Sequence, residues 1–469
     1  MIAAMAALRH TAEGFWLEEA GAAELESQPP LSGSHDVDVA VVGGGYTGLW
    51  TAWHLLQREP GARVAVLEGA RCGHGPSGRN GGFAEDYWYG IARAREQLGA
   101  GPALSLARAA EESVRAIGSW CEEQQVDAWF RPGGYLAVST APAQDETGLA
   151  SMRACRELGV PEKVTALDQA GLRARCDSPV FRRGAFVPSF ATVQPARLVL
   201  GLRRRLIEAG ALVYEHTRAR RLRGGTIETE GGRLRAGAVV LAGNAALAGF
   251  GPLRGRLTVA SSHMVLTEPV PDVLEQVGWT GGECITDGRT LLHYLRTTPD
   301  GRIAFGWAGG RLAFGARLGG RVEVDGAIVA QARRDLARMF PALSGRAITH
   351  AWGGPIDVSP GRLPVVGSLP GDRVHYAYGF TGNGVGPSHL AARVLSSLAL
   401  GRRDPETQLA LGPPHGARVP PEPLRWLGGS VVRAALLRKE SLEERSLPVD
   451  PVTRTVCALP RRMGITLGR

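Results

Sequence analysis

The chain contains few cysteines, almost no lysine and no long apolar run. Its six cysteines lie far apart and form no CxxC pair, which disfavours both a disulfide framework and a zinc site. A membrane-spanning helix needs about eighteen or more consecutive apolar residues, and none occurs here. The apolar opening Met1–Leu8 lacks the preceding positive segment of a signal peptide. We therefore expect a cytoplasmic protein without a metal site or a transmembrane segment.

The charge of the chain also excludes one class of partner. The net charge of +9 comes almost wholly from arginine, because Lys163 and Lys439 are the only lysines. The arginines are spread along the chain with no long basic block, which disfavours a nucleic-acid-binding protein. A length of 469 residues exceeds what a single core usually supports, so two domains are expected.

The most informative pattern is a glycine turn between two apolar strands. The alternating run Val37–Val42 leads into Gly43-x-Gly45-x-x-Gly48, and a second strand ends at Glu68 about twenty residues later. Gly43 allows the tight turn, Gly45 lets the backbone approach a pyrophosphate, and Gly48 lets the following helix pack closely. Glu68 would accept hydrogen bonds from ribose hydroxyls. An adenine dinucleotide is therefore the expected ligand.

A glycine-rich loop, Cys72–Phe83, follows Glu68 at once. The topology places this loop at the carboxyl edge of the sheet, above the expected pyrophosphate. Its glycines permit close approach of the backbone to a flat ligand, and Ser77 and Asn80 can form side-chain hydrogen bonds. The alternative interpretation is a mobile surface loop.

Later patterns predict the rest of a parallel sheet and a second unit. Ala238–Ala242 is fully apolar, as in a buried parallel strand, and Val374–Tyr378 is expected to be the last strand of the sheet. Pro195 is well placed to begin a helix that ends before Gly210. From Leu257 to Phe305 the residues alternate over longer stretches, which indicates a mainly antiparallel sheet.

Three motifs in order carry a resemblance to a known family. They are the glycine turn with Glu68, the run Ser77–Gly82, and the run Gly379–Gly384. Together they resemble the FAD-dependent D-amino-acid oxidase superfamily, especially the group with gamma-glutamylputrescine, sarcosine and glycine oxidases. The resemblance covers roughly Trp16 to Gly401 and implies that the cofactor is FAD.

The resemblance implies that this FAD is held noncovalently. Sarcosine oxidases tether flavin through a cysteine that the corresponding stretch Trp352–Asp357 lacks. His74 lies inside the flavin loop and is the remaining candidate for a covalent link.

The predicted fold class is α/β, with a Rossmann-like FAD-binding domain built from discontinuous segments and an α+β substrate domain with a mainly antiparallel sheet. The C-terminal tail contains a basic helix, which we expect to dock on its own protein rather than on a membrane surface. The expected division is an N-terminal arm at 1–35, the FAD-binding domain at 36–100, 170–256 and 350–402, the substrate domain at 101–169 and 257–349, and the tail at 403–469.

The resemblance also implies the cofactor contacts. The loop Gly382–Gly384 at a helix start would point backbone N–H groups at the N1/C2 edge of the flavin, where reduced flavin carries negative charge. The residues expected to contact FAD are Gly43, Gly45, Tyr46, Thr47, Gly48, Glu68, Gly69, Ser77, Gly78, Arg79, Asn80, Gly81, Gly82, Ala219, Gly243, Gly379, Gly382, Asn383 and Gly384.

Substrate contacts are expected on one predicted strand. Tyr294 and Arg296 share a face of that strand, and a guanidinium beside a phenol suits a carboxylate, as the family often has it here. The alternative is a structural Arg296 paired with an acid such as Asp287. His263 is a further candidate base, preferred over His293 and His350 because it begins a strand leading from the domain crossing.

The resemblance implies an enzyme that oxidises the C–N bond of a small amine or amino acid. Hydride would pass to flavin N5, and water would hydrolyse the resulting imine. Oxygen is the expected electron acceptor, although neither lysine lies in a predicted site segment to activate it, and another acceptor is the alternative. The competing functions are a flavin monooxygenase and a non-catalytic flavin-binding protein or basic binding module.

Overall fold

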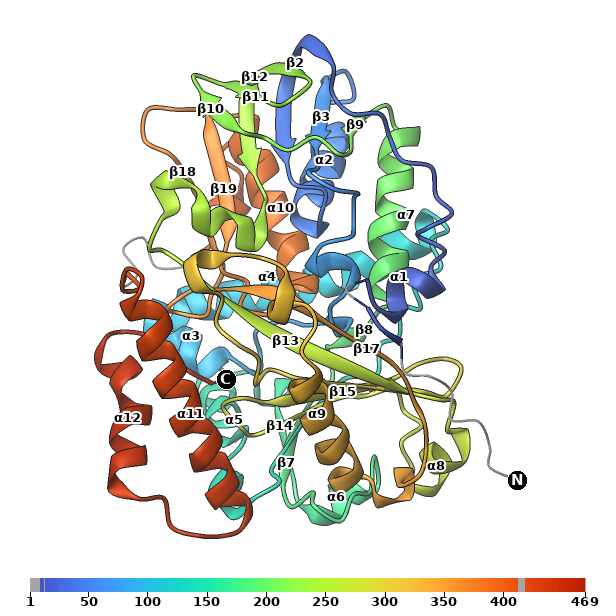
Figure 1. The fold of residues 1–469 in the computed structure, drawn as a ribbon, viewed down its shortest axis with the longest axis vertical. Coiled ribbons are helices and arrows are strands. Elements are labelled where there is room, and N and C mark those ends of the chain that lie inside the picture. Colours follow the sequence, from blue (N-terminus) through green and yellow to red (C-terminus); the bar gives the residue numbers. More distant parts are fainter. Residues whose placement is uncertain (1–8, 12, 412–417, 469) are drawn as a thin grey trace.

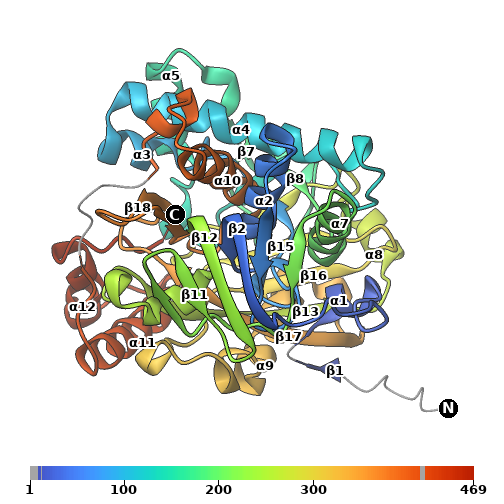
Figure 2. The same ribbon diagram turned by 90° about the horizontal axis from the view of Figure 1, so that it is seen from above.

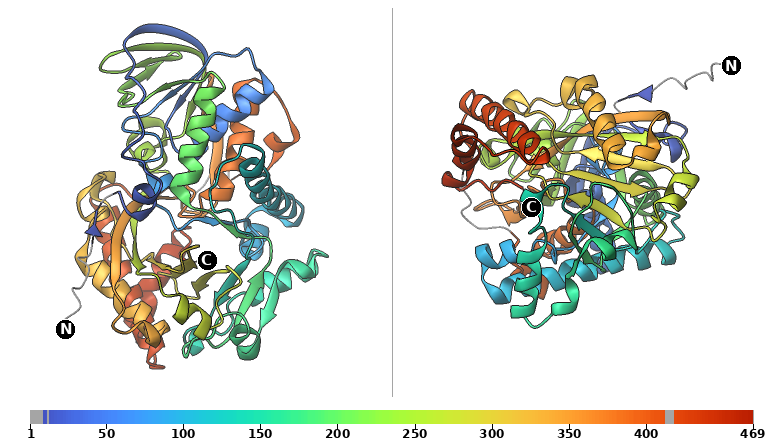
Figure 3. Two further views of the ribbon diagram at one scale, coloured as in Figure 1. Left: turned by 90° about the vertical axis from the view of Figure 1, so that its right-hand side faces the viewer. Right: turned by 90° about the horizontal axis from the view of Figure 1, so that it is seen from below.

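The structure is a computed structural model that describes residues 9–11, 13–411 and 418–468. The apolar opening Met1–Leu8 of the expected N-terminal arm and the pair Pro413–Pro414 of the expected tail lie outside the described residues. The described chain forms two large sheets, one above the other along the long axis of the molecule, and one two-stranded sheet, β4 with β8 (Figure 1, Figure 3). No helix among the described residues is long and apolar enough to cross a membrane.

The upper sheet is the parallel sheet that the sequence predicted. Five of its strands run parallel and are neighbours in the order β9, β3, β2, β12 and β19. An antiparallel extension, β11 and β10, continues from β12, and β18 pairs with β19. The strand bounds are β2 Gly33–Val42, β3 Val64–Leu67, β9 Leu212–Tyr214, β10 Arg221–Arg223, β11 Thr226–Glu228, β12 Gly232–Leu241, β18 Val365–Ser368 and β19 Val374–Tyr378.

A layer of helices covers one face of this sheet (Figure 2). Helix α2 packs against α10 and α7, and α10 also packs against the long helix α4. Apolar residues of these helices and of β2 and β3 form the largest buried core cluster. The helix bounds are α2 Tyr46–Arg58, α4 Ala100–Glu123, α7 Pro195–Glu208 and α10 Val385–Ala399.

The lower sheet is mainly antiparallel, as predicted, except for the parallel pairs β1–β17 and β14–β5. Its order is β1-β17-β13-β16-β15-β14-β5-β7-β6. The bounds are β1 Arg9–His10, β5 Tyr135–Val138, β6 Thr165–Leu167, β7 Gly184–Val187, β13 Thr258–Thr267, β14 Cys284–Asp287, β15 His293–Thr297, β16 Ile303–Trp307 and β17 Ile348–Val358.

Two strands of the lower sheet correct the expected domain boundaries. Strand β7 pairs with β5 and β6, and β17 pairs with β13 over almost its whole length. Strand β7 lies inside the segment 170–256, and all of β17 except its first two residues lies inside the segment 350–402; both segments were expected to belong to the FAD-binding domain. The substrate sheet therefore draws on residues 184–187 and 348–358 as well as on the expected segments.

Shorter elements connect and cover the sheets. Helix α9 packs on the lower sheet, where its apolar residues share a core cluster with β15 and β16. The remaining bounds are α1 Phe15–Glu19, β4 Phe83–Ala84, α3 Ile91–Leu98, α5 Leu149–Glu157, α6 Gln169–Arg173, β8 Ala191–Thr192, α8 Pro271–Gln276, α9 Gly326–Met339, α11 Leu424–Glu444 and α12 Pro451–Arg462. Helices α11 and α12 pack against each other beside the lower sheet, so the C-terminal tail docks on its own protein (Figure 1).

Candidate active site

A cavity of about 1540 Å³ lies where the two sheets face each other. The carboxyl ends of the parallel strands reach it through Val42, Leu67 and Ala242, and β13 and β15 supply the opposite wall. Ligands bind at this edge of open α/β sheets because the helix N-termini and loops gather there. The cavity is therefore the candidate active site.

The glycine turn has the geometry that its residues predicted. Gly43 has a φ of +120°, which a residue with a side chain rarely adopts. A Cβ on Gly48 would lie 1.9 Å from the carbonyl oxygen of Gly43, so only glycine allows the helix to start this close to the strand. Gly45 is the N-cap residue of α2, and it has no side chain that could cover the helix end.

Glu68 lies at the cavity wall as expected and organises the turn. Its two carboxylate oxygens accept hydrogen bonds from the backbone N–H groups of Gly44, at 2.7 Å, and Ala70, at 2.8 Å. Burial raises the pKa of Glu68, against the opposing effect of these N–H donors. Gly69 and Ala219 line the cavity beside it.

The loop after Glu68 folds around its own polar side chains. Ser77 Oγ accepts a hydrogen bond from the N–H of Tyr46 at 2.9 Å, which joins the loop to the start of α2. Asn80 Oδ1 accepts from the N–H of Gly82 at 2.7 Å, while its amide nitrogen donates to the carbonyls of Pro76 and Ser77. The loop is ordered by these bonds, which contradicts the alternative of a mobile surface loop.

A second helix end points into the same cavity. Gly382, Asn383 and Gly384 line the cavity, and Gly384 is the N-cap of α10 without a side-chain hydrogen bond. The preceding turn needs the left-handed backbone, with φ values of +56° at Thr381 and +87° at Gly382. Two long helices therefore point their N-terminal N–H groups and positive dipole ends at one cavity, which suits a ligand with negative charge; Ser77 Oγ accepts from the first N–H of α2.

The buried acid Asp357 supports this second turn, and sequence reasoning missed it as a site residue. Its Oδ2 accepts a hydrogen bond from the N–H of Gly379 at 2.5 Å, and its carbonyl accepts from the N–H of Thr381. Burial raises the pKa of Asp357 to about 6. A single acid in a glycine-rich strand has no periodic signal in the sequence, so only the fold reveals its place at the cavity wall.

Most of the residues expected to contact FAD line this cavity. Four of them are glycines that do not line it and instead pack closely against another part of the chain: Gly48 against Gly43, Gly78 against the carbonyl of Gly73, Gly82 against the carbonyl of Val193, and Gly379 against Ser359. The expected residues that line the cavity are Gly43, Gly45, Tyr46, Thr47, Glu68, Gly69, Ser77, Arg79, Asn80, Gly81, Ala219, Gly243, Gly382, Asn383 and Gly384.

Tyr294 lies on the opposite wall of the cavity, as expected. Ser262 Oγ donates its single proton to the carbonyl of Trp307 at 3.0 Å. In its 2.8 Å hydrogen bond with Tyr294, Ser262 Oγ is therefore the acceptor and the phenol is the donor. Burial raises the pKa of Tyr294 to about 12, which keeps the phenol protonated. Its oxygen therefore has lone pairs left to accept a hydrogen bond from a ligand in the cavity.

The prediction that Arg296 binds a substrate carboxylate is wrong in this structure. Its guanidinium is only 2% exposed, donates to the carbonyls of Val193 and Thr297, and lies 5.5 Å from the centre of the Trp16 ring. It does not line the cavity. Burial lowers the pKa of Arg296 to about 10. The alternative pairing with Asp287 is also wrong, because that acid binds other partners.

His263 is not part of the cavity wall either. Thr258, Ala260, Ser262 and Met264 line the cavity from β13, so the alternation of the strand turns His263 to the other face of the sheet. His350 does not line the cavity and lies 3.4 Å from Glu18.

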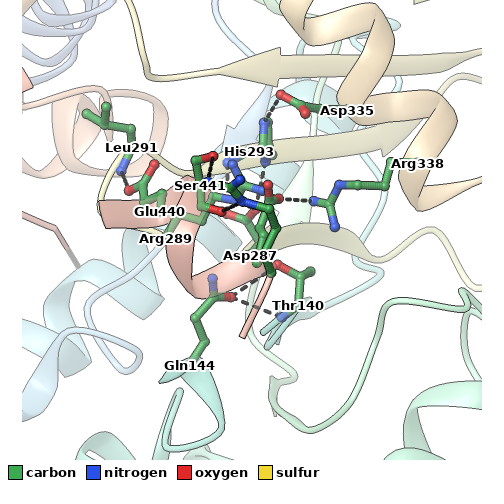
Figure 4. Close-up of polar contacts among 12 residues, drawn as sticks. Thr140, Gln144, Asp287, Arg289, Leu291, His293, Asp335, Arg338, Glu440 and Ser441 are labelled. Carbon is green, nitrogen blue, oxygen red and sulfur yellow. Dashed lines mark hydrogen bonds and ion pairs between the residues drawn. The ribbon is translucent and has the colours of Figure 1, made fainter. Parts of the chain in front are cut away.

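His293 belongs to a buried charge network below the cavity (Figure 4). Its Nδ1 lies 2.7 Å from Asp287 Oδ2 and its Nε2 lies 3.1 Å from Asp335 Oδ2. Although burial opposes the charged ring, the two carboxylates outweigh it and raise the pKa of His293. Arg289 continues the network, 3.2 Å from Asp287.

Comparisons with known proteins identify the family. The family model described as DAO, FAD dependent oxidoreductase, matches residues 38–398. The chain is 30% identical over 441 residues to the probable oxidoreductase OrdL of Rhizobium meliloti, covering 90% of this chain and 95% of that protein. It is 30% identical over 380 residues to the gamma-glutamylputrescine oxidoreductase of Escherichia coli, covering 79% and 85%.

Solved structures share the fold. The crystal structure of glycine oxidase from Geobacillus kaustophilus matches with a TM-score of 0.68 and 21% identity, covering 81% of this chain and all of that chain. L-proline dehydrogenase from P. horikoshii matches with a TM-score of 0.62 and 20% identity, covering 82% and 96%.

Proposed function

The chain belongs to the DAO family of FAD-dependent oxidoreductases, and we propose that it oxidises the C–N bond of a small amine or amino acid. One observation carries this proposal. A single cavity joins the N-termini of α2 and α10 to the hydrogen-bonded pair Tyr294 and Ser262. The first part suits an anionic dinucleotide with a flat ring, and the second offers a hydrogen-bond acceptor for an amine N–H.

The residues present fit FAD. The turn at Gly43–Gly48 and the N-terminus of α2 would hold the pyrophosphate, and Glu68 at the end of β3 would bind the ribose. The loop Gly382–Gly384 would place the end of α10 against the flavin. We propose noncovalent binding, because no cysteine or histidine is among the described residues that line the cavity.

The substrate wall would bind and orient the amine. Bound FAD supplies the oxidant, since its N5 accepts the hydride from the carbon beside nitrogen. Tyr294 would accept a hydrogen bond from the amine N–H, because its own proton is committed to Ser262. This contact would orient the amine nitrogen, and the hydride would leave from the neutral amine, whose nitrogen lone pair assists its loss. Phe83 packs edge-to-face against Tyr294 and keeps the ring in place.

The electron acceptor is proposed to be oxygen, with another acceptor as the alternative. Neither lysine lines the cavity: Lys163 pairs with Glu111 at 2.9 Å and Lys439 pairs with Glu443 at 2.7 Å. Oxygen reduction would therefore proceed without a lysine from this chain. None of the six cysteines forms a disulfide, which supports the proposal of a reducing, cytoplasmic compartment.

Anaerobic mixing with a panel of amines and amino acids tests the proposed function. Bleaching of the flavin absorbance by an amine is the expected result, and admission of oxygen should then restore the colour and release hydrogen peroxide. Tyr294→Phe should retain FAD but slow the reduction, because the hydrogen-bond acceptor for the amine is lost. No bleaching by any member of the panel, or bleaching by NAD(P)H alone, would contradict the proposal.

A further inference from the structure

The cavity does not end at Tyr294. It continues to a C-terminal cap, which we define as residues 424–468 and which consists of α11, α12 and the segment that follows them. Apolar side chains of the cap line this part of the cavity, among them Val431, Leu436, Leu459, Met463 and Leu467. The cap lies outside the segment 38–398 that matches the family model.

The wall opposite the cap is also apolar. Leu291 and Leu292 come from the turn before β15, and Leu312 follows β16. Leu312 contacts α11 closely, since a Cβ on Gly429 would lie 2.0 Å from its Cδ1. We call the space between these leucines and the cap the apolar chamber.

The two arginines of the cap that line the cavity are already engaged. Arg425 donates to Glu422 at 2.7 Å, and Arg433 donates to the carbonyls of Gly309, at 2.6 Å, and Gly310, at 2.7 Å. The Arg425 guanidinium therefore holds the cap to the segment just before it, and the Arg433 guanidinium holds it to the loop after β16. The chamber is left with a mainly apolar surface, which favours an apolar ligand group.

The cap is held firmly against the lower sheet (Figure 4). Glu440 Oε1 accepts a hydrogen bond from the N–H of Leu291 at 2.8 Å, and Glu444 pairs with Arg289 and, at 2.7 Å, with Arg338. Beyond α12, the N–H of Thr466 donates to the carbonyl of Pro360 at 2.8 Å. These contacts fix the end of α11 and the segment after α12, so the apolar side chains of the cap form a preorganised wall.

We propose that the apolar chamber binds an alkyl or aryl substituent of the substrate, so that this enzyme oxidises amines with a large apolar group in preference to glycine-sized ones. This inference rests on the proposed function and names the substrate class. The occupant is a part of the substrate rather than a lipid surface or a protein partner, because the chamber and the flavin side form one continuous cavity. Each buried methylene should strengthen binding about fourfold.

Amines that cannot be oxidised separate binding from chemistry. We would titrate the FAD-loaded full chain with tert-butylamine and cumylamine, which carry no hydrogen on the carbon beside nitrogen, and follow the perturbation of the flavin spectrum. Cumylamine should bind about tenfold or more tightly than tert-butylamine, because its phenyl group would fill the chamber.

Two matched variants locate the selectivity in the cap. Val431→Asn changes an exposed side chain that lines the cavity, and Leu427→Asn changes one on the same helix, 51% exposed, that does not. Val431→Asn should weaken cumylamine about tenfold and leave tert-butylamine unchanged. Met463→Asn, beyond the end of α12, should act like Val431→Asn, whereas Leu427→Asn should behave as the unmodified protein.

Equal affinity for the two amines would overturn the inference, and so would equal effects of Val431→Asn and Leu427→Asn. Binding of the chain to phosphatidylcholine vesicles, weakened by both variants, would show a lipid-docking surface instead. The two proposals fail differently. Selective binding of cumylamine without oxidation of any amine would contradict the proposed function but not the inference about the chamber. Oxidation of small and large amines with the same kcat/KM would contradict the inference about the chamber but not the proposed function.

Discussion

Gly48→Ala tests the link between the glycine turn and the cofactor site. The new methyl carbon would lie 1.9 Å from the carbonyl oxygen of Gly43 and 3.2 Å from Val41 Cγ1. The oxygen is backbone and cannot rotate away, because Gly43 is held by its N–H bond to the carbonyl of Leu67 at 2.9 Å. The strand and α2 must therefore separate, and the turn must open where the pyrophosphate would bind.

The expected magnitude follows from two opposing effects. Overpacking of this kind costs about 1–3 kcal/mol, whereas alanine in place of glycine favours the helix by about 1 kcal/mol. Since backbone meets backbone, the cost should lie at the upper end, which leaves a net loss of about 2 kcal/mol in the free energy of unfolding. The affinity for FAD should fall as well, because the N–H groups of the turn no longer converge.

Gly326→Ala is the matched control. Gly326 also lies in the first turn of a helix, α9, but an added Cβ there would meet no atom within 4 Å beyond its chain neighbours and its own helix backbone, and it does not line the cavity. This variant should be stabilised by up to about 1 kcal/mol and should bind FAD normally. The assays are urea unfolding of the FAD-free chain and titration with FAD followed by absorbance. If Gly48→Ala were as stable as Gly326→Ala and retained FAD, the close approach of α2 to Gly43 would not constrain the site.

Three further changes test the polar core. Arg296→Met should cost about 1–3 kcal/mol for each carbonyl left without a donor, measured by urea unfolding, and should not raise KM for carboxylate substrates selectively. Burial raises the pKa of Asp357 from 3.8 to about 6, so ionisation of this carboxyl lowers the free energy of unfolding by up to about 3 kcal/mol. Unfolding curves of Asp357→Asn should thus lose the fall in stability that the parent shows between those pH values, and an unchanged fall would exclude Asp357 as its source. Asp335→Asn should destabilise most at a pH below about 6.5, where His293 is charged in both states, and progressively less as the pH rises through its raised pKa. A loss that grows with pH instead would show that His293 is neutral.

The cofactor half of the site was predictable because its signals are local. The turn at Gly43–Gly48 and the N-cap position of Gly384 depend on a few adjacent residues, whose conformational needs can be read from the sequence. The strands β3 and β19 were predicted to within a residue for the same reason. Gly82 and Gly379 do not line the cavity, since a glycine needed for close packing looks the same in a sequence as a glycine facing a ligand.

The substrate half depends on contacts between distant segments. The alternation of side chains correctly placed Tyr294 and Arg296 on one face of β15. It could not predict that Gly82 and Trp16 cover the Arg296 side chain. His263 and Ser262 are adjacent in β13, so their side chains point to opposite faces of the sheet. The packing of the two sheets alone decides which of these faces lines the cavity. The expected domain boundaries assigned most of β17 to the other sheet for a related reason. The residues of β17 do not reveal that its hydrogen-bond partner is β13.

The two halves of the cavity should differ in how substitution changes them. The cofactor side is built largely from backbone N–H groups at Gly43–Gly48 and Gly382–Gly384, which a point mutation does not exchange without changing the chain path. The substrate side is built from side chains of β13, β15 and α11, such as Tyr294 and Val431. A substitution there changes size and polarity while leaving the turn geometry in place. Substrate preference can therefore shift within this fold while FAD binding is retained, which is why the selectivity of the cap has to be measured on FAD-loaded variants.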